Sequence, residues 1–266
     1  MVKFLSLSSG SNGNCYYIGN EETSLLIDLG VGLRTLKKRL ALCDIDISRI
    51  DSVLVSHDHV DHIRSLGGFT DKYKKPVYAT EKLHKALNHH FCTEGHLAGC
   101  VKILTAGEEN TLLSGVKVIP FSVPHDASDT VGYHIDFFGE KFTFMTDIGA
   151  PTDDAVRFAS LASHLIVESN YDFDSLIRGT YPKELKMRIM QGHGHLSNEQ
   201  TASLLKRSWH EGLKDIYLCH LSEINNTPKL AFDCASEALQ SIGVCVGRDV
   251  TLHCLPRREP SPVCTY

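Results

Sequence analysis

Three histidines and two aspartates fall within positions 57–62, directly after a short apolar run that predicts a β-strand. His57 and His59, two positions apart on extended backbone, can point the same way and ligate one metal ion. Asp61 and His62, at the start of the next helix, can face a second ion. A solvated polar loop would rarely concentrate these residue types so closely. The cluster therefore predicts a two-metal hydrolytic centre.

A two-metal centre needs more ligands than one loop can provide, and further candidates follow later apolar runs. His125, Asp147 and His220 each come directly after a stretch rich in β-branched and aromatic residues. The end of a strand holds a side chain in a fixed position, as preorganised ligation requires. Taken alone, a histidine at the end of a strand is more often a hydrogen-bonding residue than a ligand. The motif at 57–62 makes these three residues stronger candidates for metal ligands.

Two kinds of periodicity predict the elements that position these residues. Short apolar runs predict strands at residues 4–7, 16–18, 24–28, 53–56, 77–79, 116–121, 131–137, 141–146, 164–167 and 216–219. Apolar spacings of three and four predict helices at residues 33–42, 81–90, 153–160, 182–190, 198–211 and 228–239. Strands mixed with helices predict an α/β fold with two sheets face to face and helices outside, a four-layer αββα sandwich.

The composition is typical of one soluble domain. The chain has 266 residues, 42% of them hydrophobic, and we expect a single domain over residues 1–266 with an irregular C-terminal extension at 256–266. Ser and Gly interrupt the first apolar run at residues 8–13, so we expect no signal peptide, no membrane association and a cytoplasmic location. Nine cysteines without a CxxC pair indicate reduced thiols. The net charge of −5 neither favours nor excludes nucleic acid.

The HxHxDH motif after a strand, followed in order by His, Asp and His, resembles the metallo-β-lactamase superfamily over about residues 1–225. The resemblance implies the fold of that superfamily and two divalent metal ions, Zn²⁺ or Mn²⁺ with Fe²⁺ as a further candidate. It also implies that a water between the ions loses its proton and becomes the nucleophile. The implied ligands are His57, His59 and His125 for the first ion, Asp61, His62 and His220 for the second, and Asp147 as the bridge.

A second motif, Gly194-His195-Leu196-Ser197-Asn198, bears on the substrate. Ser197 with Gln200 fits a capping box, which places His195 just before a helix N-terminus, where an anionic group is stabilised. The motif resembles the ribonuclease Z and phosphodiesterase branch, which implies that His195 is the general acid. We assign catalytic roles to Asp61 and His195 and expect Ser197 and Asn198 to contact the substrate. A histidine that only caps or packs is the alternative.

Residues 8–15, the two histidine motifs and residues 220–228 together resemble the WalJ/YycJ group of bacterial proteins over nearly the whole chain. The group implies a metal-dependent nuclease with 5′-to-3′ exonuclease action on double-stranded DNA. We therefore expect a nucleic-acid substrate, with DNA favoured over RNA. The basic residues within 178–188 either guide the nucleic-acid backbone or form the solvated face of a helix. No role is assigned to His193, Asn225 and Asn226.

Alternative functions differ in what they require of the sequence. A thioester or lactone hydrolase of the glyoxalase II type would use the same metals without His195 as an acid. A flavodiiron-like redox protein would carry Glu in place of His59 and a flavin domain. A noncatalytic metal-stabilised module would not need a complete ligand set. A β-CASP insertion is excluded because only 72 residues lie between Asp147 and His220.

Overall fold

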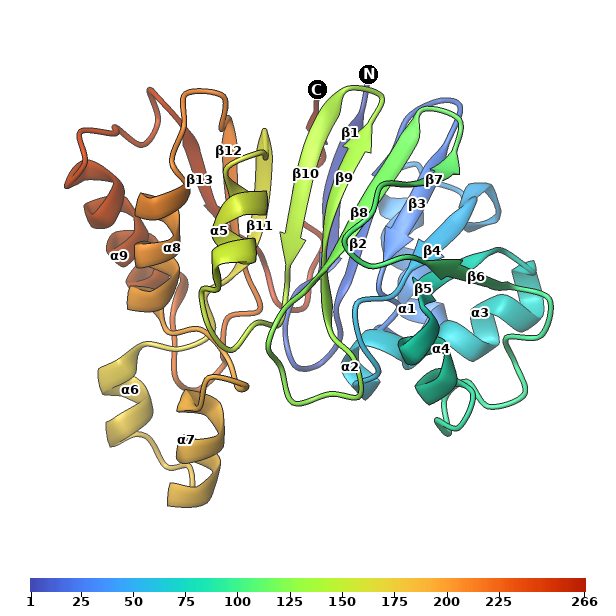
Figure 1. Cartoon of the computed structure of the whole chain (residues 1–266), viewed down its shortest axis with the longest axis horizontal. Helices are drawn as coiled ribbons and strands as arrows, with labels where there is room; N and C mark the ends of the chain where they lie inside the picture. The colour runs from blue at the N-terminus through green and yellow to red at the C-terminus, as the bar shows by residue number, and fades with distance from the viewer. The chain divides into compact units, whose positions relative to one another are not determined.

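The computed structural model describes residues 1–266, which form two mixed β-sheets that carry helices (Figure 1). The chain divides into two compact units. The first unit comprises residues 1–114, 127–130 and 256–266, and the second comprises residues 115–126 and 131–255. A single domain over the whole chain stays a prediction.

The sheet of the first unit has the strand order β14-β1-β2-β3-β4-β5-β6. Its strands are β1 (Lys3–Ser8), β2 (Cys15–Gly19), β3 (Ser24–Ile27), β4 (Ser52–Leu54), β5 (Val77–Thr80), β6 (Val101–Leu104) and β14 (Cys264–Thr265). Neighbours from β14 to β3 are antiparallel, and neighbours from β3 to β6 are parallel. Because β1, β3 and β4 run in the same direction, the loops that follow them leave the same edge of the sheet.

The helices of the first unit pack on this sheet through apolar faces. They are α1 (Leu33–Leu42), the 3₁₀ turn η1 (Ile47–Arg49), α2 (Val60–Ile63), α3 (Leu66–Tyr73) and α4 (Glu81–Leu87); the strand β7 (Asn110–Leu113) ends the unit's long segment. Helix α1 buries Leu36 and Leu40, which lie one turn apart, so a single stripe of the helix joins the core. This packing fixes the chain between β3 and β4.

The second unit contains the strand order β13-β12-β11-β10-β9-β8. Its strands are β8 (Val116–Ser122), β9 (Val131–Phe137), β10 (Glu140–Met145), β11 (His164–Glu168), β12 (Asp215–Cys219) and β13 (Thr251–Cys254). Only β9 is antiparallel to the others, and a turn with positive φ at Phe138 and Gly139 joins it to β10. The carboxyl ends of β8, β10, β11 and β12 therefore meet at one edge, where parallel sheets place their functional residues.

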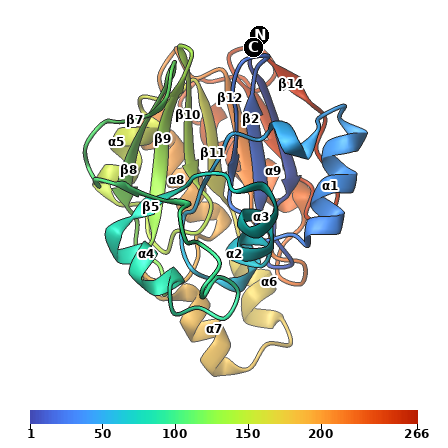
Figure 2. The ribbon, with the colours of Figure 1, turned by 90° about the vertical axis from the view of Figure 1, so that its right-hand side faces the viewer.

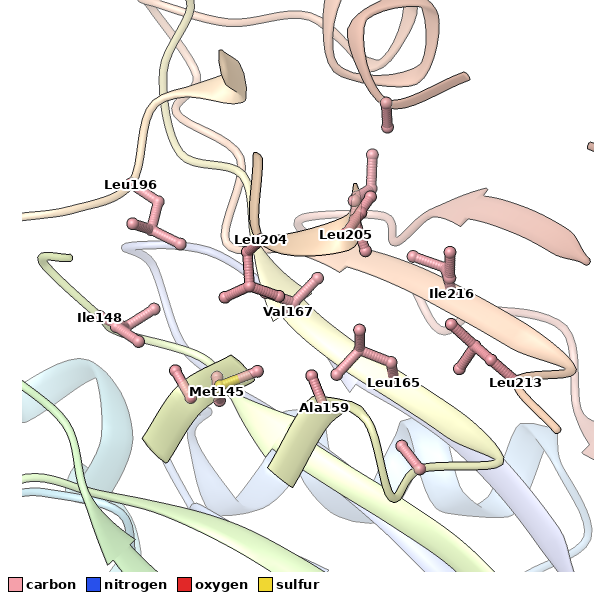
Figure 3. Close-up of a cluster of buried hydrophobic side chains, with 14 of the residues drawn as sticks. Met145, Ile148, Ala159, Leu165, Val167, Leu196, Leu204, Leu205, Leu213 and Ile216 are labelled. Atoms are coloured by element: carbon pink, nitrogen blue, oxygen red, sulfur yellow. The ribbon is translucent and has the colours of Figure 1, made fainter. Parts of the chain in front are cut away.

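A continuous apolar core holds these strand ends in place (Figure 3). It lies between the strands and the helices α5 (Asp153–Ala159), α8 (Asn198–Ser208) and α9 (Pro228–Gln240). Leu165, Leu204 and Ile216 are fully buried in it, and each such side chain stabilises the fold by about 1.5–3 kcal/mol. Tight packing of this kind gives the residues after β10, β11 and β12 a rigid support.

Two short helices, α6 (Phe173–Arg178) and α7 (Lys183–Met190), extend beyond the edge of the sheet at which β10 ends (Figures 1 and 2). Helix α7 buries none of its residues. The Lys186 ammonium donates to the carbonyls of Ile177 and Gly179, both at 2.7 Å, so α7 is tied to the end of α6. The Lys186 ammonium therefore stabilises the pair of helices α6 and α7 in addition to adding positive charge to the surface.

The elements predicted around the candidate site are present, and the omissions have local causes. The helix predicted at 33–42 and the strand predicted at 131–137 have the predicted bounds. Strands β6, β7, β13 and β14 and helices α3 and α6 were not predicted. Three of the four side chains of β6 are exposed, and α3 contains two glycines, so neither shows a strong pattern. Within 256–266 the regular element is β14, which pairs with β1.

No helix is both long and apolar enough to span a bilayer. The two chain ends lie side by side (Figure 2), where the Val2 amide donates to the Tyr266 carbonyl at 2.9 Å. All nine cysteines are free thiols, as the sequence predicted. The cytoplasmic location stays a prediction.

Candidate metal centre

The HxHxDH segment of the first unit runs from the end of β4 into α2. His57 and His62 are fully buried, and their ring centroids lie 4.0 Å apart. The His57 and His59 rings meet edge to face with centroids 4.7 Å apart, while the Asp61 side chain keeps 21% of its surface exposed. The segment therefore gathers its four predicted ligands, three imidazoles and one carboxylate, within one short stretch.

The carboxylate of Asp28, which follows β3, anchors this segment from the neighbouring strand. Its oxygens accept from the Ser56 amide and hydroxyl, both at 2.8 Å, and Oδ2 lies 2.7 Å from Nδ1 of His62. A buried carboxylate at that distance takes the Nδ1 proton as a hydrogen bond, so the lone pair of His62 is on Nε2. Asp28 has a φ of 61°, a left-handed conformation that Asp tolerates better than most residues. Asp28 fixes the imidazole in the form that a metal ligand requires.

Two residues of neighbouring loops complete the support of α2. The Asn14 side-chain amide lies 2.9 Å from His62 Nε2 and 3.4 Å from Asp61 Oδ2, and its backbone amide donates to the Asp61 carbonyl at 2.7 Å. The chain at Gly30 passes so close that an added Cβ would lie 1.5 Å from the Asp61 carbonyl oxygen. Only glycine fits this approach.

In the second unit, His125 follows the end of β8 with its ring almost fully buried. Its Nδ1 donates to the Gly194 carbonyl at 2.8 Å, because a carbonyl oxygen can only accept. The lone pair therefore resides on Nε2, which lies 3.7 Å from Oδ1 of Asp147. The predicted ligand His125 is thus hydrogen-bonded to the loop that carries the predicted acid His195.

Glu168, the last residue of β11, connects the remaining candidates of this unit. Its Oε1 lies 2.7 Å from Nδ1 of His195 and 2.8 Å from Nδ1 of His220. Its Oε2 accepts from the backbone amides of Ile148 and Leu196 at 3.1 and 3.2 Å. One fully buried carboxylate therefore orients both imidazoles and both loops that carry them.

Four residues of the second unit could share an ion. Asp147, Glu168, His195 and His220 each offer one ligand atom, and these atoms lie within 4.8 Å of one another. His220 has a φ of 52°, and the side-chain amide of Asn170 donates to the His220 carbonyl at 2.8 Å. Strained backbone of this kind persists where its surroundings over-determine it, often at functional sites. His125 and His220 each place a proton on Nδ1, so each keeps on Nε2 the lone pair that a metal ligand requires.

The pKa of His195 is shifted in the opposite direction from the pKa of His125 because the charges around the two rings differ. Burial opposes protonation of His195, but the charge of Glu168, the hydrogen bond to it and the charge of Asp147 together raise the pKa of His195. Burial likewise opposes ionisation of Glu168, and the two imidazoles outweigh it and lower the pKa of Glu168. Burial lowers the pKa of His125, with Asp147 opposing. The unit thus favours a neutral ligand at His125 and a proton-carrying imidazole at His195.

The loop after His195 has the predicted capping box. The Ser197 hydroxyl accepts from the Gln200 amide at 3.2 Å, and the Gln200 side chain accepts from the Ser197 amide at 2.9 Å. Asn198 is buried, accepts from Ser169 at 2.6 Å and exchanges amide hydrogen bonds with Asn226. Both side chains are thus engaged inside the protein, and contact of Ser197 and Asn198 with a substrate stays a prediction.

The two asparagines and the histidine without an assigned role differ in position. Asn226 ties the β11 loop to α8 by donating to the carbonyls of Ser169 and Asn170 at 2.9 and 3.1 Å. Asn225 is buried, and its carbonyl accepts from the Asp172 amide at 2.8 Å. His193 is exposed. Asn226 is therefore a structural residue of the second unit.

Sequence reasoning missed the two carboxylates that orient the histidines, Asp28 and Glu168. Both stand at the carboxyl end of an apolar strand, which is the same signal that led to the predicted ligands. Other aspartates near the motifs have structural partners instead. Asp58 accepts from the Ser128 hydroxyl at 2.5 Å, and Asp126 accepts from Arg188 at 2.5 Å. These two carboxylates stabilise the loops that carry them through hydrogen bonds to Ser128 and Arg188.

Comparison with known proteins identifies relatives over the whole chain. Residues 23–213 match the family described as the Beta-lactamase superfamily domain. Exodeoxyribonuclease YycJ of Bacillus anthracis is 32% identical over 262 residues, covering 98% of each chain. Exodeoxyribonuclease WalJ of Streptococcus pneumoniae is 31% identical over 251 residues, covering 94% of this chain and 93% of that protein.

Solved structures share the fold at lower identity. The metallo-β-lactamase fold protein YhfI from Bacillus subtilis has a TM-score of 0.71 and 16% identity, covering 98% of this chain and 99% of that one. Zn²⁺-bound PqqB from Methylobacterium extorquens has a TM-score of 0.71 and 17% identity, covering 99% and 100%. The predicted α/β metallo-β-lactamase fold and the predicted hydrolase class are confirmed. This chain belongs to the metallo-β-lactamase superfamily and, within it, to the YycJ/WalJ group.

Proposed function

We propose that this chain is a dinuclear metal-dependent phosphodiesterase that acts as a 5′-to-3′ exodeoxyribonuclease. The observation that carries the proposal is the shared arrangement of His62, His125 and His220, each of which donates its Nδ1 proton inside the protein and so carries its lone pair on Nε2, the atom that would bind a metal. The full-length relatives named exodeoxyribonucleases support the choice of reaction. The proposed ligands are His57, His59, Asp61, His62, His125, Asp147 and His220.

Two divalent ions, when bound, supply a nucleophile at neutral pH and neutralise the charge that develops on a phosphate. The donor set of imidazoles and carboxylates suits Zn²⁺ or Mn²⁺, and Fe²⁺ fits the same ligands. The chain's own contribution is orientation. Asp28 and Glu168 hold three of the imidazoles in one tautomer, so little rearrangement is needed for ligation.

His195 is proposed to protonate the leaving 3′-oxygen of the nucleotide being released. Its Nδ1 is committed to Glu168 at 2.7 Å, so the proton available to substrate is on Nε2. The raised pKa of His195 supports this role, because an acid must hold its proton near neutral pH. Asp61 is the second residue to which we assign a catalytic role, as a ligand whose side chain is partly exposed.

The test is cleavage of 5′- and 3′-labelled DNA and RNA, single- and double-stranded, by metal-stripped protein supplied with Mn²⁺ or Zn²⁺. Stepwise release of nucleotides from the 5′ end of DNA is expected, with Asp61→Ala inactive and His195→Ala slower by about 10²–10⁴-fold. His193→Ala is the matched control, since His193 is an exposed histidine two residues away. Wild-type cleavage no faster than that of Asp61→Ala on every nucleic acid would reject the nuclease proposal.

The relatives do not favour the alternative, a thioester or lactone hydrolase. Parallel assays with a glutathione thioester and a lactone separate the two. A thiolate leaves without protonation, so turnover of the thioester would be insensitive to His195→Ala. Hydrolysis of either compound in preference to DNA would replace the exonuclease proposal.

A further inference from the structure

Three arginines converge on the loop that follows β1 in the first unit. Arg64, at the end of α2, donates from Nη1 to the Asn12 carbonyl at 3.1 Å. The Asn12 amide oxygen, in the orientation that satisfies its hydrogen bonds, accepts from Nε and Nη2 of Arg258 at 3.2 and 3.1 Å. The stem of Arg257 packs on Gly10, where an added Cβ would lie 3.2 Å from its Cγ. Guanidinium groups from two distant segments, those of Arg64 and Arg258, thus contact the same residue, Asn12.

The C-terminal segment is fastened to this loop by the backbone. The Arg257 carbonyl accepts from the Ser8 hydroxyl at 2.8 Å and from the Ser9 amide at 3.3 Å. Arg39 of α1 donates to the Leu7 carbonyl at 2.9 Å and to the Arg258 carbonyl. The arginines are therefore held by ordered contacts within the first unit, and the segment predicted as an irregular extension has a fixed place.

The same loop touches the proposed metal ligands. Asn14, two residues after Asn12, contacts His62 at 2.9 Å and donates from its backbone amide to the Asp61 carbonyl at 2.7 Å. Two residues span at most about 7 Å of extended chain. Arg64 is itself the C-cap residue of α2, two positions after the proposed ligand His62, so the loop that the arginines contact adjoins the ligand-bearing helix.

The three arginines Arg64, Arg257 and Arg258, called here the arginine rim, have the charge and the donor geometry to bind a phosphate. Arg64 is exposed, and no ion pair joins it to a carboxylate. Arginine presents a rigid fork of donors that matches phosphate oxygens, and it keeps its charge at every working pH. Within residues 257–259, two arginines and Glu259 give a formal charge of +1, although the whole chain carries −5. A positive rim beside a metal centre favours a polyanionic strand.

We propose that Arg64, Arg257 and Arg258 form a binding site for the DNA phosphate adjacent to the scissile one. The inference rests on the proposed exonuclease function and extends it to the substrate's backbone. The site positions the strand so that the scissile phosphate faces the ligands on the β4 loop. At a 5′ end, the adjacent phosphate is the terminal one, so a 5′-phosphorylated strand engages the site fully.

The test measures DNA binding by fluorescence anisotropy in EDTA, which prevents cleavage, with 5′-phosphorylated and 5′-hydroxyl duplexes over a range of salt concentrations. The variants are Arg64→Gln and Arg258→Gln, singly and together. Arg157→Gln on α5 is the control, because it removes an equal charge from an exposed helix surface. We expect each substitution to weaken binding by about tenfold and the double variant to flatten the dependence of log Kd on log salt by about 1.

The two substrates distinguish which phosphate is bound. Loss confined to the 5′-phosphorylated duplex assigns the terminal phosphate, and equal loss on both duplexes assigns an internal one; either result supports the site. Unchanged Kd and salt dependence in the double variant, with wild-type thermal unfolding, would overturn it. Hydrolysis of bis(4-nitrophenyl) phosphate by wild type, measured separately with Mn²⁺, reports the metal chemistry, so a failure of the proposed function is recognised independently.

Discussion

Replacing Glu168 by Gln tests the central electrostatic contact of the second unit with almost no change in shape. The carboxylate accepts four hydrogen bonds, two from the imidazoles of His195 and His220 and two from the backbone amides of Ile148 and Leu196. A glutamine has one acceptor oxygen and turns an NH₂ group toward the other two donors. At least two donors therefore lose their partner in a fully buried place.

The expected cost follows from these bonds. A hydrogen bond to a charged group contributes about 1.5–3 kcal/mol, and breaking a buried charged contact by removing one partner costs about 3–5 kcal/mol. We expect Glu168→Gln to lower the free energy of unfolding of the metal-stripped protein by about 3–5 kcal/mol. Because the proposed ligand His220 loses the acceptor that fixes its Nδ1 proton, we expect metal affinity to fall by about 10–100-fold.

Urea unfolding followed by the fluorescence of Trp209, the single tryptophan, measures the first quantity, since its side chain packs against the core of the second unit. Competition with a chelating dye measures the second. Glu199→Gln on the exposed first turn of α8 is the matched control and should cost less than about 1 kcal/mol. A Glu168→Gln protein with unfolding and metal affinity equal to those of the control would refute the assignment of Glu168 as the orienting residue.

Three further predictions address other contacts. Gly30→Ala places a Cβ against the Asp61 carbonyl, so α2 must shift and dye competition should report metal binding weakened by about tenfold or more; wild-type affinity would show that the loop has room. Asp215 lies 2.7 Å from the buried His164, and although burial opposes ionisation, hydrogen bonds from His164 and Thr251 lower its pKa. Its contribution to stability is therefore full above its ordinary pKa of about 4 and lost as pH falls through the lowered value. Asp215→Asn should destabilise the protein at pH 7 and approach wild type in acid, whereas an equal deficit in urea titrations at both pH values would contradict this. Metal at about 100 times its Kd should stabilise the stripped protein by about 2.7 kcal/mol, and thermal unfolding unchanged by Mn²⁺ and Zn²⁺ would count against a resident metal.

The proposed ligands could be nominated from the sequence because their signal is local. Within 57–62, residue types and spacing alone indicate a metal site. His125, Asp147 and His220 became candidates through a repeated local feature, a polar residue after an apolar strand. Each of these judgements needs only the residues on either side of the position in question.

The orienting carboxylates could not be assigned in this way because their partners are distant in the chain. Asp28 is 34 residues from His62, and Glu168 is 27 residues from His195 and 52 from His220. Only the register of β3 beside β4 and of β11 beside β12 brings these groups together. A carboxylate at the end of a strand was visible in both places, but its partner was not. The short edge strands were missed for a related reason, since pairing stabilises them more than their own pattern does.

The two units use the same physical device. In each, one parallel strand carries a buried carboxylate at its end, and a neighbouring segment carries a histidine whose Nδ1 donates to it. Once the proton is fixed on Nδ1, the imidazole has a single tautomer with its lone pair on Nε2. Metal binding therefore need not expend free energy to select that tautomer. The cost is the burial of one carboxylate in each unit, which its hydrogen-bond donors must offset. The proposed ligands and the carboxylates that orient them are therefore interdependent, and a substitution at Asp28 or Glu168 should act through the histidines even though neither residue is among the proposed ligands.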